Sequence, residues 1–373
     1  MTRLAAAQAA GDVLNALGVD QSRPIDPFEA IENSGLELRF QPLEDLLGVM
    51  LRTGPGGVLI NSERPASLQR YTAAHELGHW HLHRADLRLE TDETITAYQP
   101  HDGRELDAQT FAAHFLMPLE LLYPTARRYG IRRGETVRPA QVYQAARDMH
   151  VSYEAAVRQL VNTRLVSRDA RVELLKARPL RIKQELADGV TPPDTRGDVW
   201  LVDHPGQQTS VEAFVGDAIV LRLAEHPSSG FRWCTDPDPA SATVRQLRRP
   251  PADFDRGRAF DETTAVPAEV IPMPVANVTS EVVTLLRDEV VRAPCEVDVT
   301  TVGAPVTRLV AYGAAAPGRE SIHLSETRPF QPTERAASLE VSALVRGAPA
   351  SEFRRRYIQR FLLEEAAARQ NDE

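Results

Sequence analysis

Cysteine is almost absent from this chain, which has only Cys234 and Cys295 among its 373 residues. Two cysteines exclude a disulfide framework and a zinc site built on thiolates, so any bound metal would need histidine and carboxylate ligands. No apolar run approaches the ~18 to 20 residues of a membrane span, and Met1 to Ala10 lack the long apolar core of a signal peptide. We therefore expect a cytoplasmic protein with no membrane partner.

A surplus of basic side chains is also missing, because 43 lysines and arginines stand against 52 acidic residues, for a net charge of -9. This balance argues against general polyanion binding. With 42% hydrophobic and 25% charged residues, the composition excludes a disordered or low-complexity chain. At roughly 100 to 200 residues per domain, the length predicts two domains or three.

The amino-terminal half is predicted to be mainly helical around a small sheet. Periodicity, proline and glycine predict helices over residues 3–17, 28–33, 66–84, 104–117, 119–128, 139–149 and 152–162. Between the second and third of these helices, three short apolar runs separated by glycine and proline predict strands that begin near Leu36, Leu46 and Gly56. A small sheet is therefore expected before the first long helix.

The carboxy-terminal half changes character after a segment rich in proline, glycine and aspartate, residues 187–198. Short alternating runs follow, and they predict a β-sandwich. The residues after position 350 have the apolar spacing of an amphipathic helix. We expect an α+β chain with domains at 1–190 and 199–345, a linker at 191–198, and a terminal helix within 346–373.

The helix predicted over residues 66–84 contains one motif that is typical of metal sites. His75-Glu76-Leu77-Gly78-His79 is an HExxH sequence, in which two imidazoles one helical turn apart can bind one Zn²⁺. Glu76 lies beside them, where it can deprotonate a water molecule that the ion activates. The motif predicts a metallohydrolase with Glu76 as its general base.

A third protein ligand is needed, and a carboxylate on the helix over 104–117 is the best candidate. Glu105 begins that helix on a stripe of small residues, which would allow close helix packing. Four other carboxylates remain as alternatives, three in the loop before this helix and one on another of its faces, although we expect each of them to be solvated: Glu90, Asp92, Glu93 and Asp107. The metzincin spacing would require glycine at position 82 and histidine at position 85, where the chain has Leu82 and Ala85.

Two further histidines are not favoured as ligands. His83 continues the i, i+4 series, but it would lie about 12 Å along a straight helix from His75. His81 points to another face of the helix. An oxyanion donor cannot be assigned from the motif, and four side chains stay open for that role: Tyr71, Tyr123, Tyr143 and His114.

The strings INSERPASLQRYTAAHELGHWHLH and ELDAQTFAAHFLMP resemble the ImmA/IrrE family of bacterial and phage metallopeptidases, and the similarity extends over about residues 4–167. The resemblance implies zinc ligands at His75, His79 and Glu105, with Glu76 as the catalytic base. Gln109 stands where the family usually has asparagine. It further implies a zinc endopeptidase that cleaves a helix-turn-helix transcriptional repressor of a mobile element or a stress response.

A helix-turn-helix-like region is expected at about residues 139–167, with Ser152 as the cap of its second helix. That helix offers only Arg158, followed by Arg164, against Glu154, which is a poor face for phosphates. Packing is therefore favoured over direct DNA binding.

Residues 199–345 resemble the chagasin-type inhibitors of papain-like cysteine proteases, a family of small immunoglobulin-like sandwiches. The resemblance rests on three loops that depart from the family's loops: residues 226–230, residues 303–305 and residues 328–330. We expect the first and third loops to form a partner-recognition surface, made of His226, Pro227, Ser228, Ser229, Gly230, Trp233, Arg328, Pro329 and Phe330. The alternative to an enzyme is thus a protein-binding or inhibitory module whose zinc domain is vestigial or regulatory.

Overall fold

A computed structural model describes residues 3–51, 56–83, 103–203, 209–225, 229–235, 280–291, 306–328 and 331–359. The chain divides into two compact units. Unit 1 comprises Met1–Trp200, Glu212–Ala218 and Arg346–Glu373, and unit 2 comprises Leu201–Val211 and Ile219–Val345. The boundaries expected from the sequence, 1–190, 191–198, 199–345 and 346–373, stay a prediction.

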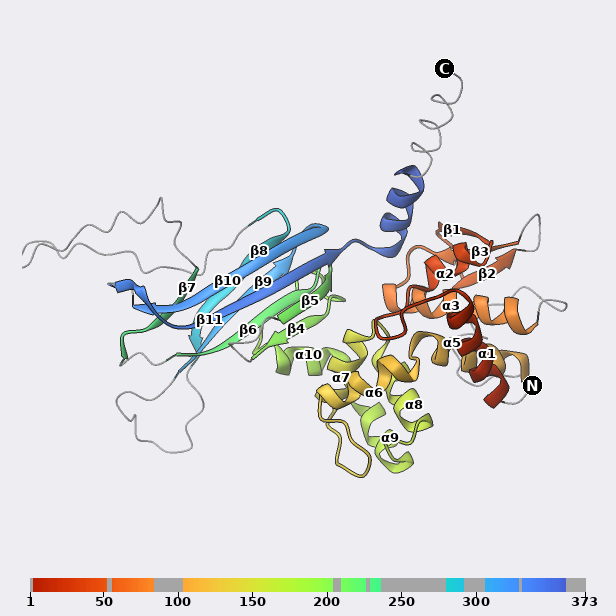
Figure 1. The fold of residues 1–373 in the computed structure, drawn as a ribbon, viewed down its shortest axis with the longest axis horizontal. Helices are drawn as coiled ribbons and strands as arrows, with labels where there is room; N and C mark the ends of the chain where they lie inside the picture. Colours follow the sequence, from red (N-terminus) through yellow and green to blue (C-terminus); the bar gives the residue numbers. More distant parts are fainter. Residues whose placement is uncertain are drawn as a thin grey trace, which may run out of the picture. The chain divides into compact units, whose positions relative to one another are not determined.

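Unit 1 is built from helices and one small sheet (Figure 1). Its described helices are α1 (Arg3–Ala16), α2 (Pro27–Asn33), α3 (Ala66–Leu82), α5 (Gly103–Leu116), α6 (Leu119–Arg128), α7 (Pro139–Asp148), α8 (Tyr153–Asn162), α9 (Arg168–Lys176) and α10 (Pro179–Leu186). Seven of them lie where the periodicity placed them, to within a residue or two. Helices α9 and α10 were not predicted individually.

The small sheet of unit 1 contains β1 (Glu37–Gln41), β2 (Gly48–Leu51) and β3 (Gly57–Asn61), in the order β1-β3-β2. Strand β1 runs parallel to β3, whereas β2 runs antiparallel to it. The central strand β3 is paired on both edges and mostly buried, and it leads directly toward α3. The three strands agree with the sequence prediction.

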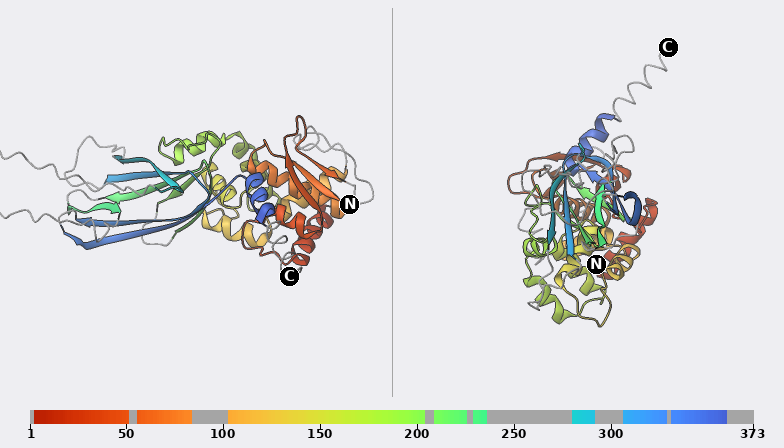
Figure 2. Two further views of the ribbon diagram at one scale, coloured as in Figure 1. Left: turned by 90° about the horizontal axis from the view of Figure 1, so that it is seen from above. Right: turned by 90° about the vertical axis from the view of Figure 1, so that its left-hand side faces the viewer.

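The strand-rich part of the chain forms two sheets of four strands each (Figure 2). One sheet has the order β5-β11-β10-β7 and the other β4-β6-β9-β8. The strands are β4 (Val199–Val202), β5 (Thr209–Phe214), β6 (Ala218–Glu225), β7 (Arg232–Thr235), β8 (Val283–Val291), β9 (Val306–Ala314), β10 (Gly318–Arg328) and β11 (Gln331–Arg346). Alternate side chains of β10 and β11 are buried, as expected for sheets with one face in a core. The predicted α+β class is confirmed.

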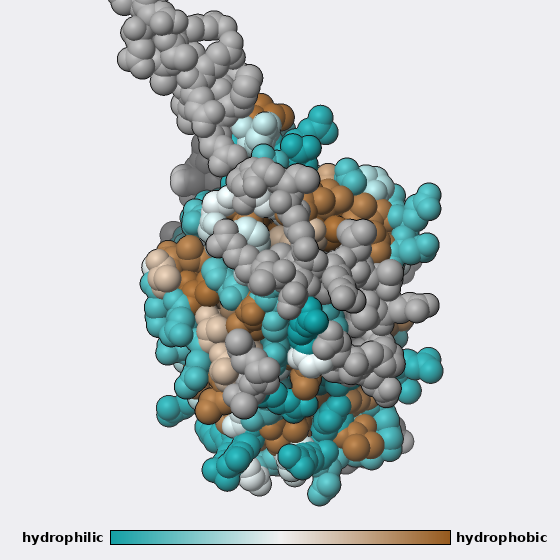
Figure 3. All heavy atoms as spheres, turned by 90° about the vertical axis from the view of Figure 1, so that its right-hand side faces the viewer, coloured by the Kyte–Doolittle hydropathy of each residue, from teal (hydrophilic) through white to brown (hydrophobic). Residues whose placement is uncertain are grey.

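The surface of the described residues is mixed. On the face of unit 1 drawn in Figure 3, hydrophobic side chains form several separate groups among hydrophilic ones. Among the described residues, no helix is both long and apolar enough to cross a membrane. The amphipathic terminal helix predicted after residue 350 is described over residues 349–359, where Phe353 packs on Phe40 with ring centroids 5.5 Å apart.

A buried charge cluster joins four strands of unit 2. The guanidinium of Arg308 on β9 makes two hydrogen bonds of 2.7 Å to the carboxylate of Asp288 on β8, and it also donates to the carbonyl of Trp233 on β7. Its Nη1 lies 3.6 Å from Oε1 of Glu225 on β6. Because all three charged side chains are at least 90% buried, each depends on the others for compensation.

Replacing Arg308 with leucine is expected to destabilise unit 2 by roughly 3 to 5 kcal/mol, because two buried carboxylates lose their cation. Thermal unfolding followed by calorimetry measures this loss. The double variant Arg308→Leu, Asp288→Leu serves as the control and should be less destabilised than the single variant. Equal stability of the Arg308→Leu variant and the wild type would contradict the prediction.

Candidate metal centre

The turn from β3 into α3 is fixed by one buried asparagine. The side-chain amide of Asn61 donates to the carbonyl oxygens of Leu43 and Leu46, at 2.5 and 2.8 Å, and its oxygen accepts from the backbone N–H of Glu63. Gln69 in the first turns of α3 donates to two carbonyls of the same turn. These contacts determine where the helix begins and therefore where its histidines lie.

Helix α3 is held from its side by Arg70, which is 7% exposed. The Arg70 guanidinium donates to the backbone carbonyl of His150, at 3.1 Å, and to the carbonyl of Ile25. Burial lowers the pKa of this guanidinium from its ordinary value, and the nearby Asp26 opposes that effect. Arg70 therefore connects α3 to the turn before α2 and to the turn between α7 and α8.

His75 and His79 lie one turn apart on α3 and face Glu105 on α5. Their Nε2 atoms are 3.0 Å apart, and each lies 3.3 Å from an oxygen of the Glu105 carboxylate. All three side chains are buried, at 0%, 3% and 5% exposure. Glu76, at 2% exposure, follows His75 on the same helix.

This donor set fits a metal ion. Two imidazole lone pairs and a carboxylate that point at one another repel unless a proton or a cation lies among them. Tetrahedral bonds of 2.0 to 2.1 Å place ligand atoms about 3.3 Å apart, which is close to the three separations observed. The group formed by His75, His79 and Glu105 can therefore bind a metal ion.

Close packing of α3 on α5 brings Glu105 to the two histidines. Gly78 lies between them in sequence, and a Cβ atom built on it would come 3.1 Å from Cδ1 and 3.2 Å from Cβ of Phe111. Because position 78 has no side chain, the two helices can approach closely enough for the Glu105 carboxylate to reach the two histidines. The buried alanines Ala73, Ala74, Ala108 and Ala112 belong to the same two helices.

The alternative ligands are placed as follows. Asp107 is 3% exposed, so the expectation of a solvated carboxylate is wrong, and its Oδ2 lies 4.0 Å from Nε2 of His83. His83 caps the end of α3, and the ring of His81 stacks near Phe111. Three other carboxylates considered lie outside the described residues: Glu90, Asp92 and Glu93.

The four possible oxyanion donors differ in position. The ring of Tyr71 stacks 6.1 Å from that of His75, which places it at the metal group. Tyr143 donates its hydroxyl proton to Asp198 at 2.7 Å and is thus used elsewhere, Tyr123 is 44% exposed, and His114 lies beside Gln159. Tyr71 is the one of the four whose ring stacks on a histidine of the metal group.

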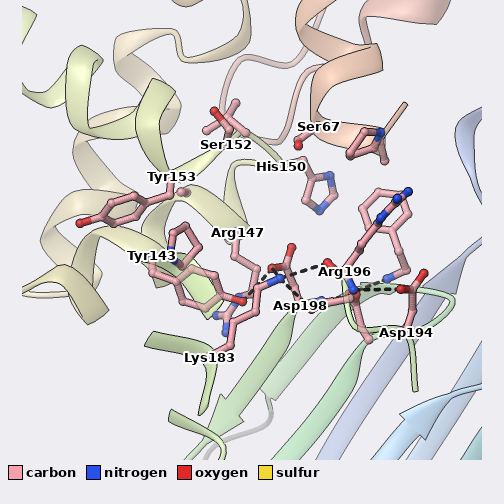
Figure 4. A pocket seen from close by; sticks show the side chains of 18 of the residues that line it. Ser67, Tyr143, Arg147, His150, Ser152, Tyr153, Lys183, Asp194, Arg196 and Asp198 are labelled. Atoms are coloured by element: carbon pink, nitrogen blue, oxygen red, sulfur yellow. Dashed lines mark hydrogen bonds and ion pairs between the residues drawn. The ribbon is translucent and has the colours of Figure 1, made fainter. Parts of the chain in front are cut away.

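A separate cavity of about 420 Å³ lies at the amino-terminal end of α3 and beside α7 (Figure 4). Several of its polar groups bond to one another: Tyr143 to Asp198, Lys183 to Asp198 and to the carbonyl of Arg196, and Asp194 to the backbone N–H of Arg196. These interactions are typical of a region where helices and loops pack on one another. No sequence pattern predicts this cavity, because its residues are scattered from Arg64 to Asp217.

His150 lines this cavity, and it is a non-glycine residue with a positive φ of 55°. Burial holds the pKa of its imidazole well below the ordinary value, and the charge of Arg70 adds to that effect. The ring packs edge-on against Phe214, with centroids 5.2 Å apart. His150 is therefore neutral at pH 7.

The described parts of the loops predicted to recognise a partner in unit 2 are adjacent. Thr327 pairs with Arg232, and the guanidinium of Arg328 lies 4.6 Å from the ring centroid of Phe231, next to Ser229 and Gly230. Trp233 is 1% exposed, so its indole lies in the core and not at a surface. Five other predicted recognition residues lie outside the described residues: His226, Pro227, Ser228, Pro329 and Phe330.

Residues 31–161 match the model of a peptidase family, Peptidase_M78, described as an IrrE N-terminal-like domain. Among solved structures, a cysteine protease inhibitor from Entamoeba histolytica is 14% identical, with a TM-score of 0.25, and the match covers 40% of this chain and 95% of that one. Amebosin is 13% identical, with a TM-score of 0.25 and coverage of 40% and 100%. No curated protein matches the chain.

The Gly78→Ala variant is expected to bind zinc more weakly by roughly tenfold, because the new methyl group pushes Phe111 and α5 away from α3. Its stability should change little, since alanine gains up to about 1 kcal/mol of helix propensity. Competition with a chromogenic chelator measures the affinity. Gly11→Ala on α1, where an added Cβ meets nothing within 4 Å, is the matched control and should keep wild-type affinity.

Acidification should destabilise the protein through His150. Because its folded pKa lies below the unfolded value, the unfolded state takes up the proton first, and this stability is lost as pH falls below about 6.5. The loss is at most about 1.4 kcal/mol per pH unit. We expect His150→Asn, which tolerates a positive φ, to lose less stability between pH 7.5 and 5 than the wild type in chemical unfolding. Identical slopes would contradict this.

Proposed function

We propose, from the match of residues 31–161 to a peptidase family, that this protein is a zinc-dependent endopeptidase. The observation that carries the proposal is the convergence of His75, His79 and Glu105 into one buried group, with Glu76 beside it. Two nitrogens and one carboxylate form the donor set of catalytic zinc sites that keep a fourth position for substrate or water. His75, His79 and Glu105 would hold the ion.

The chemistry divides between the ion and the chain. When bound, zinc supplies a Lewis acid that polarises the scissile carbonyl and makes water more acidic. Glu76 accepts a proton from the attacking water and then delivers it to the leaving amide nitrogen as the peptide bond breaks. Burial of Glu76 keeps bulk water from competing for that proton.

We further propose that the substrate is a specific intracellular protein, a helix-turn-helix transcriptional repressor. Support comes from the resemblance to the ImmA/IrrE peptidases over about residues 4–167, which includes the helix-turn-helix-like region now described as α7 and α8. In this proposal the sandwich is a recognition or sensing domain. Its surface would include Ser229, Gly230 and Arg328, which lie close to one another.

The Glu76→Gln variant should retain fold and zinc but lose proteolysis by about 10²- to 10⁴-fold, because an amide keeps the shape and cannot accept the proton. The assay incubates the full chain with a helix-turn-helix repressor encoded beside its gene and follows cleavage by mass spectrometry. Zinc content is measured on the same samples by elemental analysis.

Two matched variants complete the test. Glu105→Gln should lose zinc as well as activity, whereas Glu120→Gln, at an exposed position in the first turn of α6, should change neither. A Glu76→Gln protein that cleaves at the wild-type rate would overturn the role of Glu76. A wild-type protein that retains no zinc would overturn the proposed metal site.

A further inference from the structure

A second and larger cavity, of about 1220 Å³, opens between α1, α5, α8 and α9 of unit 1. We call it the arginine groove. None of the described residues that line it is aspartate or glutamate, and six are arginine: Arg3, Arg133, Arg158, Arg164, Arg168 and Arg171. In a chain with a net charge of -9, this is a local concentration of positive charge.

The arginine groove begins beside the metal group. Tyr71, one turn before His75 on α3, lines it, and so does Gln109, one turn after Glu105 on α5. The Nε2 atom of Gln109 is buried and makes no hydrogen bond to the described residues. An amide donor in this position can serve the backbone carbonyl of an extended peptide that leaves the metal group.

The arginines of the groove are available to a ligand to different degrees. Arg158 is paired with Glu154 at 2.5 Å, so its charge is partly compensated. Arg168, in the first turn of α9, is exposed, and Arg171, one turn later, is partly exposed. A cation in the first turn of a helix is unfavourable to the helix dipole, so local stability does not explain Arg168.

Arg164 provides an independent indication. It follows α8 with a left-handed φ of 62°, a position at which glycine or asparagine is the ordinary residue. A side chain there costs about 1 kcal/mol relative to glycine. The exposed arginine at this position lines the groove. Backbone strain of this kind is expected where the side chain itself has a function.

We propose that the arginine groove binds an acidic segment of the protein substrate and guides the adjoining peptide toward His75, His79 and Glu105. That this segment belongs to a substrate rests on the proposed function, whereas binding of an acidic peptide does not. A short segment is favoured over duplex DNA because the positive charge lies inside a concave site, on a chain whose remaining charge repels a long polyanion. Arginine also matches carboxylates in bidentate geometry.

The test measures binding of a fluorescein-labelled twelve-residue peptide with six glutamates to the full-length Glu76→Gln protein by fluorescence anisotropy. Glu76→Gln is used so that binding is not confused with cleavage. A peptide of the same length with lysine in place of glutamate and a mixed-sequence duplex DNA are the comparison probes. Each probe is titrated at two salt concentrations, because charge-driven binding weakens as salt rises.

We expect the acidic peptide to bind, and the Arg168→Glu, Arg171→Glu pair to weaken it by at least about tenfold, since two attractions become repulsions. The Arg178→Glu, Arg181→Glu pair has the same change in net charge at two exposed positions, the N-cap and the first turn of α10, neither of which lines the groove. It should weaken binding by less than about threefold. Circular dichroism and zinc content verify that both pairs fold.

Equal weakening by the two pairs, tighter binding of the lysine peptide, or preferential binding of the DNA would overturn the proposal. These outcomes are distinct from failure of the proposed function, which is judged by zinc content and cleavage. If the protein proved not to be a peptidase, selective loss of the acidic peptide in the Arg168→Glu, Arg171→Glu pair would still establish the groove as a binding site.

Discussion

The contact between Gly78 on α3 and Phe111 on α5 is the constraint on which the candidate site depends. Glutamate reaches only a few ångströms from its backbone, so Glu105 can approach the two Nε2 atoms only when the helices themselves are in close contact. The missing side chain at position 78 provides that closeness on the same helix turn that separates the two histidines. The small residue at position 78 therefore determines both how closely the two helices pack and whether the three ligands meet.

Much of the candidate metal site could be predicted because its residues lie close together in the sequence. The histidine pair and Glu76 belong to one helix, where a local repeat fixes their relative positions, and a stripe of small residues marked the face of the next helix. The expectation for Asp107 was wrong because its environment depends on His83, which caps the end of α3, and local periodicity does not contain that information. Trp233 was assigned to the partner-recognition surface from a loop motif, but it is buried in the core of the sandwich. Its burial also depends on tertiary packing that a local motif does not contain.

Other features could not be found from spacing at all. The arginine groove combines residues of five helices and the segments between them, so its charge is assembled only when α1, α8 and α9 pack together. Within α8 alone, Arg158 and Arg164 opposed by Glu154 form a weak basic pattern, and the sequence therefore argued against phosphate binding. A charge count made on one helix underestimates a concave site to which several helices contribute.

Arg70 gives α3 a second set of fixed points. Its guanidinium reaches the carbonyls of Ile25 and His150, so rotation of α3 about its axis would break both contacts at once. The region after residue 138 is consequently not a module that can be exchanged freely. A chimera that takes α7 and α8 from a relative must reproduce the left-handed turn at position 150, or the histidine helix loses an anchor 80 residues away in the chain.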